Sequence, residues 1–409
     1  MHHASLTRLS RAAPDARQGP RQTLAEALAA SRADTLSTFN AYQRARPDLV
    51  VPLHAELNPP LWELGHIGWF QEYWLTRNAE RAHGAGADPE APRAAPLRPG
   101  ADALYNSSHV PHDSRWQLPL PDAAATRDDL ARQLDTSQAL LQQTGESDAE
   151  LYFFRLALLH EDMHHEAALY MARALGIATE DPRWRAQPLP APASPLAFGA
   201  CEWRLGSKPG EGFAFDNELP GCTVELRPFE IDGQAVRWAE FLPFLDAGGY
   251  DDPRWWTEAG ARWRAAQPAA APRYLRRAAA GWECWRDGVW GALDLREAAS
   301  HLSLHEAQAW CRWAGRRLPT EAEWECAACS APDAFRWGDV WEWTGSPFQP
   351  FPGFLPHPYR DYSAPWFDGR PVLRGASHCT QPRMRHLRYR NFFPAARNDV
   401  PAGFRSCRL

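Results

Sequence analysis

Apolar residues in the first half of the chain recur every three or four positions, which is the period of an α-helix. Four segments with this pattern are predicted to be helices: residues 23–44, the segment that Asn58 caps before Pro59, residues 122–143, and a last helix that ends at Gly176. A long polar connection separates the second helix from the third. This arrangement predicts a four-helix bundle, a scaffold that builds metal sites from inward-facing side chains.

The pattern changes beyond Phe198, where short apolar runs are broken by glycine and proline. Fifteen of the twenty tryptophans lie in this part of the chain. The pattern predicts a loop-rich α+β domain that aromatic packing holds together. The predicted organisation is a disordered tail (residues 1–21), a helical bundle (22–180), a proline-rich linker (181–197) and the α+β domain (198–409).

Charge and composition exclude several classes of function. The formal net charge is −6 and no basic stripe follows a predicted helix, so no nucleic-acid partner is expected. No apolar run approaches the ~20 residues of a membrane span, and no membrane contact is expected. Residues 1–22 lack the apolar core of a secretory signal, so a cytoplasmic location is expected, with a mitochondrial presequence as the weaker alternative. All eight cysteines lie in the second half and are expected to be free thiols.

Three histidines in the first half are candidate metal ligands. His160 and His164 are four residues apart on one helical face, close enough to share a metal ion. His66 lies on an otherwise aromatic helical face, where a lone histidine is more often a hydrogen-bonded core residue. Gly65 and Gly68 flank it and allow another segment to approach the backbone closely. A packed or exposed polar helix face is the alternative interpretation of the first pair.

Short motifs in both halves carry a resemblance to known families. The second half contains, in this order, Arg317-Leu-Pro-Thr-Glu-Ala-Glu-Trp-Glu325, Trp337-Gly-Asp-Val-Trp-Glu-Trp-Thr344, Leu373-Arg-Gly-Ala-Ser377 and Gly403-Phe-Arg-Ser-Cys-Arg408. Together they resemble the formylglycine-generating (sulfatase-modifying factor) domain, which has a C-type-lectin-like fold. The first half, with Gly65-His-Ile-Gly68 and the HxxxHxE motif that starts at His160, resembles a DinB-type bundle.

The fusion of these two parts resembles the ergothioneine, ovothiol and selenoneine synthases, and the selenoneine synthases most. These non-haem iron enzymes join sulfur or selenium to the imidazole of hercynine. The resemblance implies that His66, His160 and His164 hold Fe(II), with O2 as co-substrate. Three neutral imidazoles also suit zinc, copper or nickel, so the ligands alone do not identify the metal. His165 is expected to be structural or, at most, to support a ligand. Glu166 either holds a ligand imidazole by accepting its second N–H or caps a local network, and it is not expected to bind the metal.

The resemblance also implies substrate-contacting residues in the second half. Tyr359 is expected near the oxygen chemistry, because a phenol can donate a proton or a hydrogen atom to a reduced oxygen species. Tyr362 and Phe392 are expected to bind the trimethylammonium group of hercynine through their aromatic faces. Asn391 can bind a carboxylate or amide through its side-chain N–H groups. The alternative is that these residues are turn and core aromatics.

Two of three donor-related positions depart from the ergothioneine synthases that use γ-glutamylcysteine, and the third keeps an arginine. Phe393 stands where those enzymes have an aspartate, and His112 and Arg115 stand where they have paired arginines. A carboxylate and a guanidinium that would hold a charged dipeptide are therefore missing. Phe393, His112 and Arg115 are expected to be donor-binding residues. The departures favour a neutral donor, and the selenosugar of selenoneine synthases is neutral. A thiol donor is the alternative.

Two further classes of function compete with the synthase. One is a copper oxidase acting on a protein cysteine, as in the formylglycine-generating family, which needs two cysteines a few residues apart. Cys379 follows the third motif, but the next cysteine is Cys407. The other is a lectin-like binding module attached to an inert bundle, which requires no metal.

Overall fold

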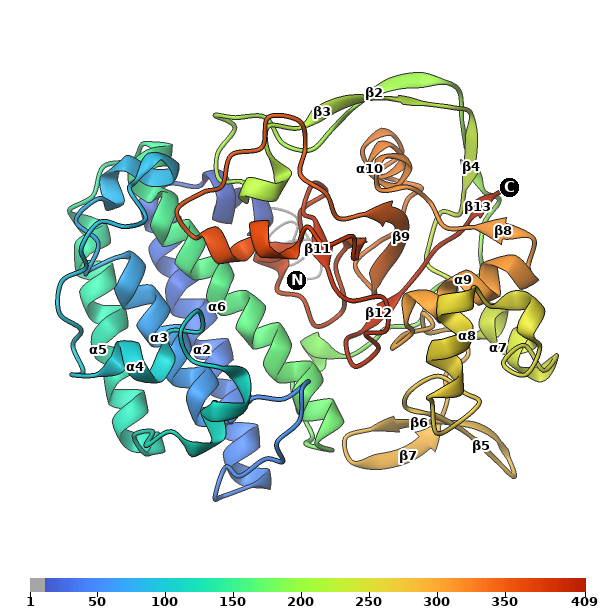
Figure 1. Ribbon diagram of the computed structural model, residues 1–409, viewed down its shortest axis with the longest axis horizontal. Helices are drawn as coiled ribbons and strands as arrows, with labels where there is room; N and C mark the ends of the chain where they lie inside the picture. Colours follow the sequence, from blue (N-terminus) through green and yellow to red (C-terminus); the bar gives the residue numbers. More distant parts are fainter. Residues whose placement is uncertain (1–11) are drawn as a thin grey trace, which may run out of the picture.

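The computed structural model describes residues 12–409, and long helices that pack side by side form its first half (Figure 1). The helices of this half are α2 (Arg21–Ala45), α3 (Pro60–Trp74), α4 (Ala101–Tyr105), α5 (Ala123–Gln142) and α6 (Asp148–Ala174). The four predicted helices are confirmed, and the long connection from α3 to α5 contains the short α4. The likeness to DinB-type bundles stays a prediction.

The ends of these helices follow from their capping residues. Asp122 caps α5 by accepting from the backbone N–H of Ala125, and Ser147 and Glu150 form a capping box at the start of α6. The prediction that Asn58 caps α3 is wrong, because α3 begins at Pro60 and its N-cap is Pro59. The Asn58 side chain donates instead to Glu63 within the helix, at 2.6 Å.

The second half mixes helices with four small sheets, as the sequence pattern predicted. Its helices are α7 (Trp238–Asp246), α8 (Glu258–Ala265), α9 (Leu304–Trp313) and α10 (Glu321–Ser330). Its strands are β1 (Leu196–Phe198), β2 (Cys201–Leu205), β3 (Cys222–Leu226), β4 (Phe229–Ile231), β5 (Leu275–Ala278), β6 (Gly281–Arg286), β7 (Val289–Ala292), β8 (Arg316–Arg317), β9 (Trp341–Pro347), β10 (Pro371–Gly375), β11 (Asn391–Phe392), β12 (Ala402–Gly403) and β13 (Cys407–Arg408).

Two of the sheets have four strands, with β4 and β13 inside one and β9 and β10 inside the other. One sheet has the order β1-β4-β13-β8 and another β11-β10-β9-β12, in which β9 and β12 are parallel. The hairpins β2-β3 and β5-β6-β7 extend from opposite sides of the domain (Figure 1). Short 3-10 helices occur in the connections of both halves, among them η1 (Arg81–Gly86), η2 (His112–Gln117), η4 (Asp216–Glu218) and η6 (Arg360–Tyr362).

The four sequence motifs of this half meet in its core as buried ion pairs. Arg405 donates to Glu342 at 2.8 Å, and Arg374 forms a comparable pair with Glu325. Trp324 also donates to Glu342, at 2.9 Å. The four charged residues are at most 1% exposed. Because an unpaired buried charge costs several kcal/mol, each motif needs its partner motif, which explains their joint occurrence.

The predicted disordered tail is wrong for residues 12–20, and residues 1–11 lie outside the described part. Residues 12–18 are helical, and Arg17 is buried against Glu218 in η4. The sequence around Arg17 has no apolar pattern that would predict this packing. The partner of Arg17 lies 201 residues away, so local spacing could not indicate it either. The proline-rich linker is also packed: the buried Trp184 ring lies 5.0 Å from that of His165, and the backbone N–H of Leu189 donates to Arg296.

Helix α6 makes several of the contacts that join the two halves. Glu166 accepts hydrogen bonds from Trp341, Ser377 and Thr380, and Asp162 pairs with Arg383 at 2.8 Å. Of the two roles open to Glu166 from the sequence, the structure shows the hydrogen-bond network and not the support of a ligand imidazole, since its carboxylate accepts from the other half. Among residues 12–409, no helix combines the length and hydropathy that crossing a bilayer requires.

Candidate metal centre

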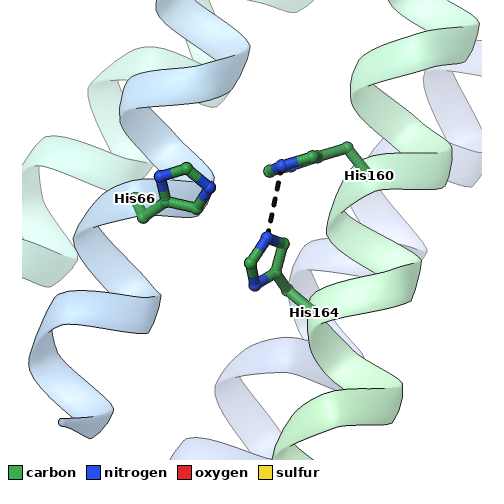
Figure 2. Close-up of side chains that lie close together, drawn as sticks. All are labelled: His66, His160 and His164. Atoms are coloured by element: carbon green, nitrogen blue, oxygen red, sulfur yellow. Dashed lines mark hydrogen bonds between the residues drawn. The ribbon is translucent and has the colours of Figure 1, made fainter. Parts of the chain in front are cut away.

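Three imidazoles from two facing helices converge inside the helical half (Figure 2). His66 comes from α3, whereas His160 and His164 come from consecutive turns of α6. One nitrogen of each ring lies within 4.8 Å of the others, and the Nε2 atoms of His160 and His164 are 3.2 Å apart. Two nitrogens bound at right angles to one ion at ~2.1 Å lie about 3 Å apart. The 3.2 Å spacing of His160 and His164 therefore fits two ligands of a single metal ion, and a nitrogen of His66 lies within 4.8 Å of both.

Burial keeps the ligand nitrogens in their metal-binding form. His66 is 2% exposed and His160 is 3% exposed. Burial lowers the pKa of His66 to about 3 and lowers the pKa of His160 well below its usual value. Both imidazoles are therefore neutral at pH 7, and neutral imidazole is the form that coordinates metals.

The backbone carbonyl of Tyr105 orients the ring of His66, and Gly65 leaves room for the Tyr105 segment to approach. The His66 Nδ1–H donates to the carbonyl of Tyr105 at 2.7 Å, which leaves Nε2 free for a metal. A Cβ at Gly65 would lie 2.3 Å from the Tyr105 ring, so a larger residue there would displace this segment. The predicted close approach at Gly65 is confirmed. Gly68 has the same role, with Gln133 2.1 Å from its would-be Cβ.

The ring of His164 is oriented by Glu63, a residue that the sequence reasoning missed. Its Nδ1–H donates to the Glu63 carboxylate at 2.6 Å, so its Nε2 is also free. Burial raises the pKa of Glu63, but the surrounding imidazoles and the Arg115 guanidinium together lower it below its usual value. Glu63 precedes His66 by three residues on the same helix. Helical spacing alone could have placed it beside the ligands.

Tyr359 lies close to the triad, separated from it by one aromatic ring. Phe70 stacks on His160 with ring centroids 3.5 Å apart, and Tyr359 contacts the Phe70 ring at 5.0 Å. The Tyr359 and His160 ring centroids are 6.2 Å apart. Burial raises the pKa of the Tyr359 phenol well above its usual range, so it keeps its proton at neutral pH. Tyr362 packs 6.1 Å from Tyr359 and shares a hydrogen bond with another tyrosine.

The remaining candidates of the second half form a neighbouring aromatic layer. Phe392 lies 6.2 Å from Tyr362, and both it and Asn391 are half-buried on β11. The Asn391 amide oxygen accepts from the backbone N–H of Phe392. Phe393 lies 5.1 Å from the Arg397 guanidinium. The structure thus joins Phe392 to Tyr362 and, through it, to Tyr359. Asn391 pairs with Leu373 of the neighbouring strand β10, and Phe393 packs against the hydrophobic core.

His112 and Arg115 lie in η2, near the start of α3. His112 donates to the carbonyl of Leu57 at 2.8 Å. Arg115 donates to the side chain of Asn58 at 2.9 Å, and its guanidinium lies 3.8 Å from the centroid of the Trp62 ring. Arg115 is therefore beside the candidate metal centre, while His112 contacts the loop before α3 and the Trp116 ring, whose centroid is 5.3 Å away.

Comparison with known proteins identifies sequence relatives of this chain. Residues 197–338 match the family model described as "Sulfatase-modifying factor enzyme 1-like domain". The chain is 31% identical over 402 residues to the "Hercynine oxygenase" of Mycobacterium tuberculosis, which covers 85% of this chain and 90% of that protein. It is also 31% identical to the protein of the same name from Mycolicibacterium smegmatis, over 94% of this chain and 98% of that one.

The chain belongs to the hercynine oxygenase family. A "Formylglycine-generating enzyme" from Streptomyces coelicolor is 36% identical over 185 residues, which are 40% of this chain and 58% of that protein. This shorter match agrees with the sulfatase-modifying-factor domain of the second half. The relatives in both groups are enzymes by name, so membership of the family indicates an enzyme with oxidative chemistry. The likeness to a hercynine-modifying family, predicted from the motifs, is confirmed.

Proposed function

We propose that the protein is a non-haem Fe(II) synthase that uses O2 to form a C–Se bond between a selenosugar and imidazole C2 of hercynine. The convergence of His66, His160 and His164 carries the proposal, in a chain of the hercynine oxygenase family. Joining the two substrates removes one proton from imidazole C2, one proton from the selenol and two electrons. Dioxygen accepts the two electrons and the two protons, which balances as hydrogen peroxide.

Three histidines would hold the iron and leave positions open. Fe(II) held there would supply the one-electron steps that reduction of dioxygen requires. The chain supplies a dry and oriented setting, because Phe70 covers His160 while Glu63 orients His164. A buried, protonated Tyr359 would deliver its proton on the side of the site that faces the second half.

The aromatic layer supports binding of hercynine. Tyr362 and Phe392 present ring faces that attract a quaternary ammonium group. Asn391, on the same strand as Phe392, would bind the hercynine carboxylate through its amide N–H groups. Phe393 and His112 would contact the donor, because both differ from the residues that the γ-glutamylcysteine enzymes have at these positions.

A cavity between the halves supports a neutral donor. It has a volume of about 300 Å3, and Phe70 and Tyr359 are part of its wall. Asn106 and the two serines after it supply amide and hydroxyl groups, which suit the hydroxyls of a sugar. Arg360 in the lining is already paired with Glu90 at 3.1 Å, so it offers no free cation to a peptide carboxylate.

A comparison of donors tests the substrate. Enzyme reconstituted with Fe(II) and supplied with O2 and hercynine should form product faster with a selenosugar than with γ-glutamylcysteine. Equal or reversed rates would reject the selenosugar and favour the second candidate, an ergothioneine-type enzyme that forms a C–S bond with a cysteine or γ-glutamylcysteine thiol. The name hercynine oxygenase, which the family relatives carry, fits either donor.

Iron content tests the metal site separately. Alanine at His66, His160 or His164 should each abolish stoichiometric Fe(II) binding. His83→Ala is the matched control, because the His83 side chain is 65% exposed and contacts Glu80, which is not part of the triad. Full iron retention in a triad variant would remove that residue from the ligand set. Retention in all three would leave the lectin-like binding module as the better hypothesis.

A further inference from the structure

A chain of side-chain hydrogen bonds runs from Arg115 to a ligand of the proposed metal site. Arg115 Nη1 donates to Asn58 Oδ1 at 2.9 Å, and Asn58 Nδ2 donates to Glu63 Oε1 at 2.6 Å. The second oxygen of Glu63 accepts from His164 Nδ1 at 2.6 Å. Each donor and acceptor in this chain can act in one direction only, since a guanidinium only donates and a carboxylate only accepts. The sequence of bonds therefore fixes the orientation of the Asn58 amide.

The same arginine reaches a second ligand through an aromatic ring. Its guanidinium carbon lies 3.8 Å from the centroid of Trp62, and Trp62 stacks on His66 with centroids 4.8 Å apart and planes 10° apart. The Trp62 indole N–H is held by the carbonyl of Leu104 at 2.8 Å, so the ring has a defined position. A cation this close to an indole face is attracted to it. Arg115 thus contacts the supports of two different ligands, one on each helix.

We propose that Arg115 is a positioning residue for the metal centre, acting on His164 through Asn58 and Glu63 and on His66 through Trp62. This role differs from the donor-binding role expected from its place in the sequence. Glu63 is 6% exposed, so a carboxylate there needs compensating partners to remain ionised and aligned with His164. Partners of this kind contribute 10–100-fold to metal affinity in other proteins. The proposal rests on the metal site proposed above.

Metal affinity without substrate tests this role. Arg115→Gln and Asn58→Ala should each weaken Fe(II) binding about tenfold or more. Both variants should also change the visible spectrum of the Co(II)-loaded protein, which reports the geometry of the ligands. Because both act through Glu63, the double variant should lose less affinity than the product of the two single losses. Arg115→Lys keeps the charge and should recover part of the affinity.

Arg127 provides a matched control in the same half. Its guanidinium donates to Asn40 at 2.6 Å and lies 5.0 Å from the Phe39 ring, so it repeats the amide and aromatic contacts of Arg115 away from the triad. Arg127→Gln should leave Fe(II) affinity and the Co(II) spectrum unchanged. Wild-type affinity and spectrum in Arg115→Gln would overturn the proposal, and a raised KM for the donor alone would identify a donor-binding arginine. A wild-type protein without Fe(II) affinity would instead reject the proposed function.

Discussion

Replacing Arg17 with methionine removes the cation that balances a fully buried carboxylate. Arg17 and Glu218 form two hydrogen bonds, at 2.8 and 2.9 Å, and their side chains are 4% and 0% exposed. Glu218 also accepts from Ser207 at 3.0 Å, but this hydroxyl carries no charge. The methionine side chain fills a similar volume, so the lost cation is the main change.

The expected loss is large because the carboxylate has no access to water. Breaking a buried ion pair from one side costs about 3–5 kcal/mol, whereas an exposed pair contributes at most about 1 kcal/mol. Urea unfolding followed by circular dichroism measures the difference. Arg262→Met is the control, because Arg262 and its partner Glu258 are 68% and 88% exposed. Adding Glu218→Gln to Arg17→Met should recover part of the loss, since a neutral amide is easier to bury.

A result in which Arg17→Met and Arg262→Met cost the same would refute this reasoning. It would mean that the N-terminal segment does not contribute to the folded state and that the tail predicted from the sequence is the better description. The reasoning is also refuted if Glu218→Gln adds to the loss instead of reducing it.

Three further perturbations test the site and its surroundings. Tyr359→Phe should retain Fe(II) but lower product formation by about 10²-fold or more, and an unchanged rate would remove the phenol from the chemistry. Glu166→Ala should lower the free energy of unfolding in urea by about 2–5 kcal/mol, because three donors from the other half lose their acceptor; a loss below 1 kcal/mol would contradict this. Burial lowers the pKa of His165, His357 and His378 to about 4, whereas unfolded histidine titrates near 6.5. Stability is therefore full above pH ~6.5 and lost as the pH falls toward 4, by about 2 kcal/mol per histidine at pH 5 in urea titrations, and a pH-independent midpoint would argue against neutral burial.

Local periodicity was sufficient to predict what lies along one helix. The spacing of His160 and His164 predicted a shared face on α6, and Gly65 predicted a close approach that Tyr105 makes. These features depend on neighbours within a turn of helix. The ion pairs among the motifs could only be anticipated from resemblance, because nothing local links Glu342 to a distant arginine.

Contacts across the two halves were beyond local reasoning. Glu166 has the spacing of a residue that could support a ligand, but its carboxylate faces partners more than 170 residues away. Arg17 lies in a segment without an apolar pattern, yet it is nearly fully buried. In both cases the free energy of desolvating a charge decides which partners the side chain needs. That free energy depends on the residues that cover the charge and not on sequence spacing. Glu63 is a different case from Glu166 and Arg17. Its spacing from His66 is visible in the sequence, but a carboxylate at that position has several possible partners.

The rigidity of α6 connects the candidate metal ligands to the residues of the second half. Its Tyr152 donates to His357 at 2.9 Å, two residues before Tyr359, and Glu166 binds the other half beyond the ligands. The helix is therefore attached to the second half on both sides of His160 and His164. An uninterrupted α-helix keeps a fixed rise per residue, so these attachments set the distance between the triad and the phenol. A different sequence in the loops around the cavity could then select a different donor while the distance between the triad and the phenol stays the same.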